Sequence, residues 1–382
     1  MKKIILSIIV LFSVLSVSGQ DVYTSVLEQI EQNSTTLEAL KEQMEAQKLG
    51  NKTGINPANP EVEFGYLWGS PSAIGNRKDI NIRQTFDFPT VYAQRSRLSD
   101  LQNNSAEYQY KSQRMELLLS AKTFCIELVY YNALGKLYER QLDNAKQIAE
   151  ANQLEYNKAV LNYTNMDNEV KRINLECKRL LSELSRLNGG NPIVFDRAVY
   201  ETAVLPADFE NWYAQAEAEN PALSYLKSQV EIDNRQVKLS RASSLPKFSV
   251  GYMGEFVAGQ KFQGATIGMS IPLWENKNKV KQAKATVKAS ERIVEDARMQ
   301  YYNRLKNLYV QVSGLQNNVR QYNSVFEQND NGDLLFKAYR NGEISLLNYL
   351  LEMEYYFVAY NKRLQAERDL ELALAELLAA ML

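Results

Sequence analysis

The chain has 382 residues, a formal net charge of −1 and no histidine. A net charge this close to zero gives no electrostatic attraction to nucleic acid, so we expect no nucleic-acid partner. Histidine is the commonest general base and the commonest transition-metal ligand, and its absence excludes His-dependent hydrolases and His-based metal sites. We predict no enzyme, no cofactor and no bound metal, with carboxylate chemistry as the one catalytic possibility left open.

The N-terminus has the pattern of a secretory signal peptide. Lys2 and Lys3 precede an apolar stretch from Ile4 to Leu15, and Val17-Ser18-Gly19 is a small-residue cleavage site. A membrane-crossing helix needs about 20 residues, and this apolar stretch is shorter. The rest of the sequence contains no longer apolar stretch. We therefore predict that residues 1–19 are removed on export. A chain without a transmembrane helix can cross a membrane only as a closed β-barrel.

The two cysteines, Cys125 and Cys177, both fall in long helical stretches. If these helices fold back near residue 161, the helical rise separates the two thiols by roughly 30 Å along the hairpin. A disulfide cannot bridge such a distance. We predict two free thiols.

The chain contains one unit twice. Pro60–Tyr66 aligns with Pro246–Tyr252 at an offset of 186, and Tyr156 aligns with Tyr339 at an offset of 183. The ordered series of matches predicts two copies of a helix, a β-hairpin and a second helix. We expect a first repeat at 20–190, an inter-repeat linker at 191–207 and a second repeat at 208–382.

Proline is absent from 90–188 and 273–382, which predicts long helices there. The offset of 183 holds over 67 residues after each hairpin, so each arm is expected to extend about 100 Å. Apolar residues spaced alternately by four and three predict antiparallel coiled-coil packing. This seam comprises Leu346, Leu350, Met353, Phe357, Tyr360 and Leu364, and then Leu370, Leu374, Leu377 and Met381.

Four segments between the helices alternate between apolar and polar residues, as strands with two different faces do. Each has about 9–10 residues, the length that a tilted membrane strand needs. The expected external turns are 69–78 and 257–262. A soluble sheet packed on a core gives a similar pattern, but four strands supply no large core. The predicted lipid-facing side chains are Val62, Phe64, Tyr66, Trp68, Ile80, Ile82, Phe86, Phe248, Val250, Tyr252, Ile267 and Met269.

Four strands leave two open edges, which a lipid environment does not tolerate. Closing the sheet therefore requires several chains. Three copies give twelve strands, within the range known for outer-membrane barrels, and a tetramer stays open as an alternative.

The chain resembles the TolC-type outer-membrane efflux and secretion channels. The most specific segments are Pro60–Tyr66, Pro246–Tyr252, Gln84–Pro89 and Tyr339–Asn348. The resemblance implies a homotrimer with a 12-stranded barrel in the outer membrane of a Gram-negative bacterium, continued by a periplasmic tunnel of long helices. It implies a passive conduit for efflux or type I secretion, with a periplasmic adaptor, an inner-membrane pump and outer-membrane lipid as partners.

The resemblance also places the periplasmic tip, where the tunnel narrows. Gly342 suits a turn that needs positive φ, and Ser345 can cap the returning helix. Asn165 and Asn348 stand where the family often has Asp, so no acidic ring is expected there. The tip and gate candidates are Tyr156, Ala159, Thr164, Asn165, Tyr339, Gly342, Ser345 and Asn348.

The alternative function is a periplasmic coiled-coil adaptor or scaffold that forms no channel. An adaptor should contain a single hairpin flanked by β-rich segments, whereas this sequence has two hairpins and no such segments. The cargo and the class of pump leave no signature in the sequence.

Overall fold

A computed structural model describes residues 23–151, 156–200, 204–329 and 332–382. The predicted signal peptide lies outside the described residues. The chain forms two compact units, and each takes segments from both predicted repeats. Unit 1 comprises Met1–Ser34, Ala121–Ala203 and Asp330–Arg368, and unit 2 comprises Thr35–Ser120, Val204–Asn329 and Asp369–Leu382.

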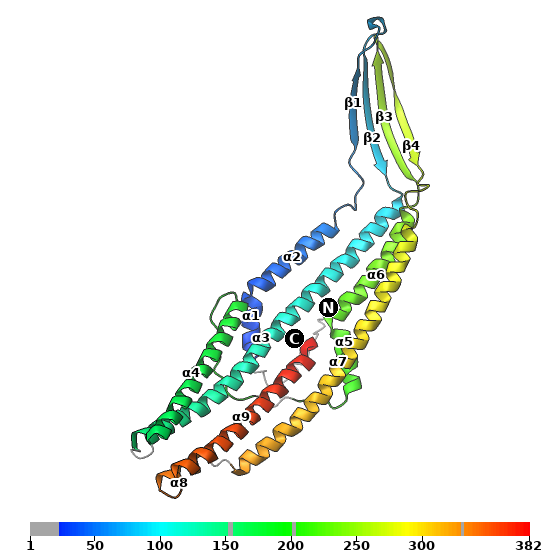
Figure 1. Ribbon diagram of the computed structural model, residues 1–382. Coiled ribbons are helices and arrows are strands. Elements are labelled where there is room, and N and C mark those ends of the chain that lie inside the picture. The colour runs from blue at the N-terminus through cyan, green and yellow to red at the C-terminus, as the bar shows by residue number, and fades with distance from the viewer. Residues whose placement is uncertain (1–22, 152–155, 201–203, 330–331) are drawn as a thin grey trace, which may run out of the picture. The chain divides into compact units, whose positions relative to one another are not determined.

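Unit 1 is helical (Figure 1). Its core joins Tyr130 and Leu134 of α3 with Ile173 of α4 and Leu364 of α9, and all four are almost fully buried. The predicted seam is confirmed at Leu346, Met353 and Leu364, which are all buried. Its helices are α1 (Thr24–Asn33), the second part of α3 (Pro89–Ala151), α4 (Tyr156–Leu187), α8 (Gly332–Arg340) and the first part of α9 (Leu346–Leu377).

Unit 2 combines helices with the sheet (Figure 1). Helices α6 and α7 pack through Val237, Ala283 and Val287. The predicted seam is wrong at Met381, which lies beyond α9 and is 49% exposed. The other helices are α2 (Thr35–Asn51), the first part of α3, α5 (Phe209–Glu219), α6 (Pro221–Ala242), α7 (Lys279–Asn329), the end of α9, and the short 3-10 turns η1 (Ser72–Ile74) and η2 (Ala379–Met381).

The four strands form one antiparallel sheet in the order β1-β2-β3-β4. The hairpins β1–β2 and β3–β4 are therefore joined through β2 and β3. The turns between β1 and β2 and between β3 and β4 lie at the end of the sheet away from its helix connections (Figure 1). The strands are β1 (Glu61–Leu67), β2 (Arg77–Phe86), β3 (Lys247–Val257) and β4 (Gln260–Ser270).

The duplication is visible in the backbone at one helix break in each repeat. Ser34 separates α1 from α2 with φ −68° and ψ 111°, and Asn220 separates α5 from α6 with φ −66° and ψ 114°. The two positions are 186 residues apart, which is the offset found in the sequence. The extended ψ ends the first helix, and the side chain of Asn220 then caps α6 by accepting a hydrogen bond of 2.9 Å from the amide of Leu223.

The predicted offset of 183 is wrong for the long helices. Helix α3 begins at Pro89 and α7 at Lys279, and α4 begins at Tyr156 and α9 at Leu346, so both pairs are 190 residues apart. The difference arises at residues 271–278, which form a turn before α7 rather than its first two helical turns. The second arm is also divided, because α7 ends at Asn329 and α8 begins at Gly332.

Helix α3 is the one helix in the described part of the chain that is long and apolar enough over one stretch to cross a membrane, judged by length and composition alone. Of that stretch, 44% is buried within the protein. Core helices of soluble proteins pass the same test, so this observation is weak evidence for a membrane helix.

The two cysteines are free, as predicted, but the reasoning from a reversal near residue 161 is wrong. Helix α3 ends at Ala151 and α4 begins at Tyr156. The thiol of Cys177 in α4 lies 3.6 Å from Oδ1 of Asn132 in α3. Asn132 is seven residues after Cys125 in the same helix. Seven residues of helix correspond to about 10 Å, which is still too far for a disulfide.

We expect both thiols to resist alkylation in the folded protein. Cys125 is fully buried, and burial raises the pKa of the Cys177 thiol, which keeps it in the unreactive protonated form to higher pH. Maleimide labelling followed by mass spectrometry should show slow modification of Cys177, slower modification of Cys125, and complete labelling of both after denaturation without reductant. Labelling that needs a reductant would indicate a disulfide and contradict this account.

Candidate functional sites

The sheet has one apolar face, and the strand register shows why. Val62 is opposite Ile82, Ile82 is opposite Tyr252, and Tyr252 is opposite Ala265. Residues directly opposite each other point to the same side of a sheet, so the apolar positions of all four strands form continuous cross-strand rows. A second such row joins Phe86, Phe248 and Met269.

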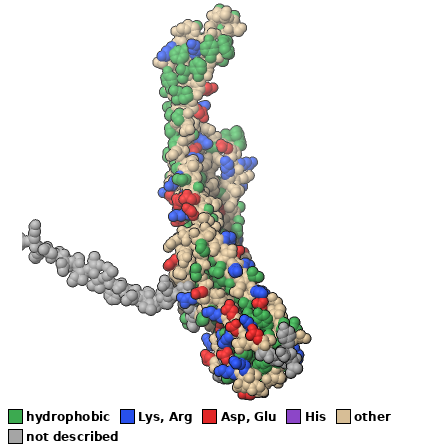
Figure 2. All heavy atoms as spheres, turned by 90° about the vertical axis from the view of Figure 1, so that its left-hand side faces the viewer, with side chains coloured by type: hydrophobic (Ala, Val, Ile, Leu, Met, Phe, Trp, Pro, Cys, Tyr) green, Lys and Arg blue, Asp and Glu red, His purple; other side chains and the backbone are tan. Residues whose placement is uncertain are grey.

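The predicted lipid-facing side chains within the strands all belong to this face, and Trp68 lies just beyond the end of β1. All of them except Ile80 are exposed. The exposed fraction is 73% at Val62 and 87% at Ile267. Figure 2 shows hydrophobic side chains gathered over the sheet, at the top of the view. A contiguous exposed apolar surface of this kind marks a surface that meets a membrane or a partner protein.

The opposite face of the sheet is polar and its cations are paired with carboxylates. Arg83 lies 3.5 Å from Glu61 on the neighbouring strand. Arg77 is 2.8 Å from Asp79 and 3.2 Å from Glu255. The sheet therefore separates an apolar surface from a charged one across the thickness of a single layer.

The sheet is open at both edges within the described residues. Strand β1 pairs only with β2, and β4 pairs only with β3. Each edge thus presents backbone donors and acceptors that another strand can pair with.

The predicted turn in the second repeat is present between α8 and α9. Gly342 has a φ of 76°, which an L-residue adopts only with strain. The amide of Glu343 donates to the carbonyl of Ala338 at 2.9 Å, as in a Schellman motif. Oγ of Ser345 accepts from the amide of Asn348 at 3.2 Å, so Ser345 caps α9 as predicted. Four of the tip candidates are thus within, or one helical turn from, this turn.

Tyr339 packs within its own subunit. Its ring stacks on that of Tyr349, with 5.4 Å between centroids. Tyr349 is buried, and its hydroxyl donates to Oε1 of Gln141 in α3 at 3.5 Å. Burial raises the pKa of Tyr349 to about 12, so its hydroxyl stays a hydrogen-bond donor over the whole physiological range.

The turn predicted between Tyr156 and Asn165 is wrong. Helix α4 already begins at Tyr156, and Thr164 donates to the carbonyl of Val160 at 2.8 Å, as a hydroxyl inside a helix does. Ala159 is buried on the inner side of α4, whereas Thr164 and Asn165 are exposed. No Gly or Pro interrupts 156–165, so nothing local stops the helix there. The residues that join α3 to α4, 152–155, lie outside the described residues.

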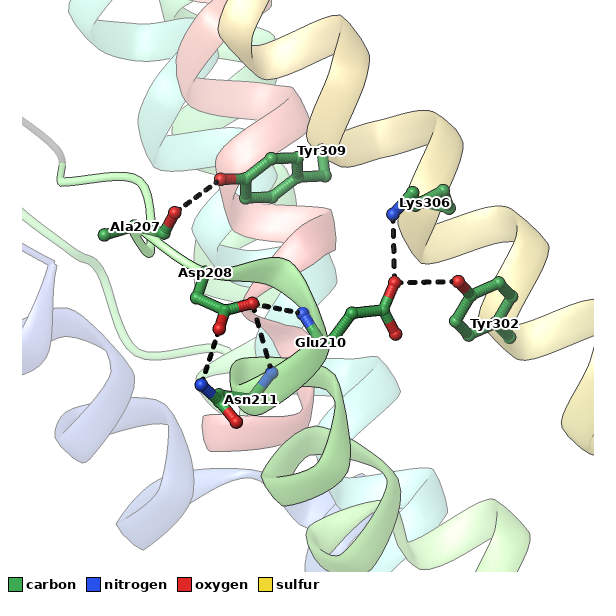
Figure 3. Close-up of polar contacts among 7 residues, drawn as sticks. All are labelled: Ala207, Asp208, Glu210, Asn211, Tyr302, Lys306 and Tyr309. Atoms are coloured by element: carbon green, nitrogen blue, oxygen red, sulfur yellow. Dashed lines mark hydrogen bonds and ion pairs between the residues drawn. The ribbon is translucent and has the colours of Figure 1, made fainter.

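A cluster at the start of α5 was not predicted from the sequence, and Figure 3 shows its polar contacts. Asp208 caps α5 by accepting from the amides of Glu210 at 2.9 Å and Asn211 at 3.5 Å. Glu210 in turn accepts from Lys306 of α7 at 3.0 Å. This fixes the end of the inter-repeat linker onto α7.

The same anchor has an aromatic part. The ring of Phe209 is 5% exposed and lies 5.6 Å from the ring of Tyr302 and 5.3 Å from that of Tyr309. The ammonium group of Lys306 stands 4.4 Å from the centre of the Phe209 ring, a cation–π distance. Tyr309 also donates to the carbonyl of Pro206 at 2.8 Å. Hydrogen bonds from Lys306 and Tyr302 lower the pKa of Glu210, which keeps its carboxylate charged.

The two-faced sheet and the long paired helices are features shared with known proteins. Residues 212–381 match the family model described as outer membrane efflux protein. The match covers less than half of the chain and lies within the predicted second repeat, 208–382. It favours the predicted outer-membrane efflux channel over the adaptor or scaffold. It also supports the predicted outer-membrane location.

Solved outer-membrane channels share the fold of this chain. The open-state MtrE channel of Neisseria gonorrhoeae superimposes with a TM-score of 0.75 at 14% identity, over 94% of this chain and 88% of that one. The CmeC channel of Campylobacter jejuni superimposes with a TM-score of 0.68 at 16% identity, over 94% of this chain and 85% of that one. The VceC protein of Vibrio cholerae superimposes with a TM-score of 0.69 at 13% identity, over 94% of this chain and 95% of that one. No curated protein matches the chain by sequence.

We expect Gly342→Ala to loosen the α8–α9 turn, because alanine at positive φ costs about 1 kcal/mol. Hydrogen exchange at 341–348 should become faster. Gly314→Ala is the matched control with the opposite sign: a Cβ at Gly314 of α7 meets nothing within 4 Å, and replacing an interior helical glycine stabilises by up to about 1 kcal/mol. Equal effects of the two substitutions would refute the role of positive φ.

We expect Phe209→Ala to destabilise unit 2 by about 3–5 kcal/mol, because it leaves a cavity between α5 and α7. Tyr302→Phe is the control, since it keeps the ring and removes only the hydroxyl that donates to Glu210 at 2.9 Å. Its effect should stay below about 1 kcal/mol. Denaturant unfolding followed by fluorescence of the buried Trp212 measures both, and a mild effect of Phe209→Ala would show that the aromatic cluster does not anchor α5.

Proposed function

We propose that the chain is one subunit of a trimeric outer-membrane channel that conducts cargo passively from the periplasm to the exterior. The observation that carries this proposal is the open, two-faced sheet. One face is apolar and exposed at Val62 and Ile267, and the other carries the Arg83–Glu61 and Arg77–Asp79 pairs. Lipid outside and water inside is the environment that such a layer fits.

The two free edges of the sheet support assembly of several copies, of which a trimer is the simplest closure. In hydrocarbon, each unpaired backbone group costs several kcal/mol, so strands persist there only in a closed barrel. Four strands per chain are too few to close, but β4 of one copy can pair with β1 of the next. Three copies make a barrel of twelve strands, wide enough for a water-filled lumen.

The long helices supply the part of the conduit on the periplasmic side. The α8–α9 turn with Gly342 and Ser345 is proposed as part of the tip, together with Tyr339 and Asn348. Ala159, Thr164 and Asn165 of α4 belong to the same unit as this turn. Tyr339 takes a packing role within this proposal, because its ring stacks on Tyr349 and not on an exposed partner.

The proposed partners are a periplasmic adaptor at the tip and an inner-membrane pump that supplies the energy. The chain itself is proposed to catalyse no reaction. Among the described residues, no three His, Cys, Asp or Glu side chains are placed to hold a metal ion. Selectivity would then depend on the opening of the tip and on the polarity of the lumen.

We expect the purified protein to migrate as a heat-sensitive trimer and to conduct ions in planar lipid bilayers. Ile267→Arg should abolish trimer insertion, because Arg near the bilayer centre costs about 2–4 kcal/mol per strand. Thr266→Arg is its neighbour on the polar face, and this variant should still form trimers with conductance shifted toward anions. A monomer that is soluble without detergent, or equal tolerance of both variants, would refute the channel.

A further inference from the structure

One cross-strand row of the apolar face differs from all the others. Tyr66 is opposite Lys78, Lys78 is opposite Phe256, and Phe256 is opposite Lys261. Aromatic and cationic side chains therefore alternate across all four strands. The row is the last one on this face before the turns that join β1 to β2 and β3 to β4.

The two lysines are paired with rings rather than with carboxylates. Nζ of Lys78 stands 5.9 Å from the centre of the Tyr66 ring, and Nζ of Lys261 stands 5.5 Å from that of Phe256. Both lysines are exposed, and neither forms an ion pair with any other described residue. This contrasts with Arg77 and Arg83 on the polar face, which both contact carboxylates.

The Tyr66 ring of this row is held in place by its neighbours. The side-chain amide of Asn76 donates to the hydroxyl of Tyr66 at 2.8 Å, and its Oδ1 accepts from the amide of Gly69 at 3.3 Å. Trp68 packs edge-on against Tyr66, with 5.4 Å between centroids. The row thus places Lys78 and Lys261 two strands apart, which corresponds to about 10 Å between their backbones.

We propose that this row binds anionic, phosphate-bearing headgroups of outer-leaflet lipids. The inference rests on the proposed function, since it requires the apolar face to lie in lipid. In that setting the aromatic rings sit at the level of the headgroups, and Lys78 and Lys261 extend to the same level. Neither cation pairs with a carboxylate among the described residues, and a lipid phosphate supplies the missing negative charge.

The inference can be tested by fluorescence quenching in reconstituted vesicles. Trp68 becomes the single reporter when the other two tryptophans are replaced in Trp212→Phe/Trp274→Phe. The full chain is placed in phosphatidylcholine vesicles containing either brominated phosphatidylglycerol or brominated phosphatidylcholine. Bromine on the acyl chains quenches only when that lipid lies beside the reporter, so free phosphate gives no signal.

We expect Trp68 to select brominated phosphatidylglycerol over brominated phosphatidylcholine. Lys78→Gln or Lys261→Gln should each lower that selectivity about fivefold, and high salt should reduce it. The matched control is Lys281→Gln/Lys288→Gln, which removes two exposed charges from α7 and should leave the selectivity unchanged. Trp274, 80% exposed beyond the other end of β4, serves as a second reporter in Trp68→Phe/Trp212→Phe and should respond to neither pair of substitutions.

The outcomes separate this inference from the function on which it rests. Strong quenching by both lipids without dependence on Lys78 or Lys261 would overturn the headgroup site and leave the channel intact. Absence of quenching by either lipid would overturn the channel itself. If the tryptophan variants fail to fold, native mass spectrometry of the otherwise unaltered protein gives the same decision: retained phosphatidylglycerol should fall in Lys78→Gln/Lys261→Gln, and equal retention would refute the site.

Discussion

The unpaired backbone groups at the edges of the sheet are the constraint on which the rest of this structure depends. A strand has a donor and an acceptor at nearly every residue, and hydrocarbon offers a partner for neither. The sheet satisfies its inner strands by placing β2 against β3, which joins the two repeats into one layer. Strands β1 and β4 keep one open edge each, so the single subunit is incomplete as a membrane structure. The proposed assembly with further copies satisfies that constraint, and it gives the apolar face a lipid environment to meet.

The sheet was predictable because its signal is strictly local. Alternation with a period of two assigns every residue to a face, and a slip of one residue would invert both faces. Val62, Ile82 and Tyr252 therefore lie on one face, as their sequence pattern predicts. The chemistry of the rows was not predictable to the same degree. Which cation meets a carboxylate and which meets a ring depends on the register between strands that are far apart in sequence.

The helix turns could be predicted only where the local residues specify them. The α8–α9 turn contains a glycine at positive φ and a serine cap, and both are readable from residues 342–345 alone. The first repeat has Ala159 at the position aligned with Gly342, and the helix passes through it. An alignment that is sound at the strands thus fails at the tip, because the offset between the helix starts is 190. Helices α4 and α9 nevertheless have the same length of 32 residues. The Phe209 cluster could not be predicted from the sequence for another reason. The residues that Phe209 contacts come from α7, about a hundred positions away, and no periodic pattern indicates which ones they are.

The two faces of the sheet also divide its charges by the solvent each is proposed to meet. Facing a water-filled lumen, Arg77 and Arg83 form ion pairs in which neither charge loses its hydration completely. Such exposed pairs contribute little to stability, but they keep the net charge of the lumen low and its surface wet. On the face proposed to meet lipid, a carboxylate beside Lys78 would lose its hydration together with the lysine. The attraction between the two charges offsets this desolvation cost only when their geometry is excellent. An aromatic ring avoids this cost, since it attracts the ammonium group without needing water of its own. The choice between Asp79 beneath Arg77 and Tyr66 beneath Lys78, on adjacent residues of one strand, follows from that difference.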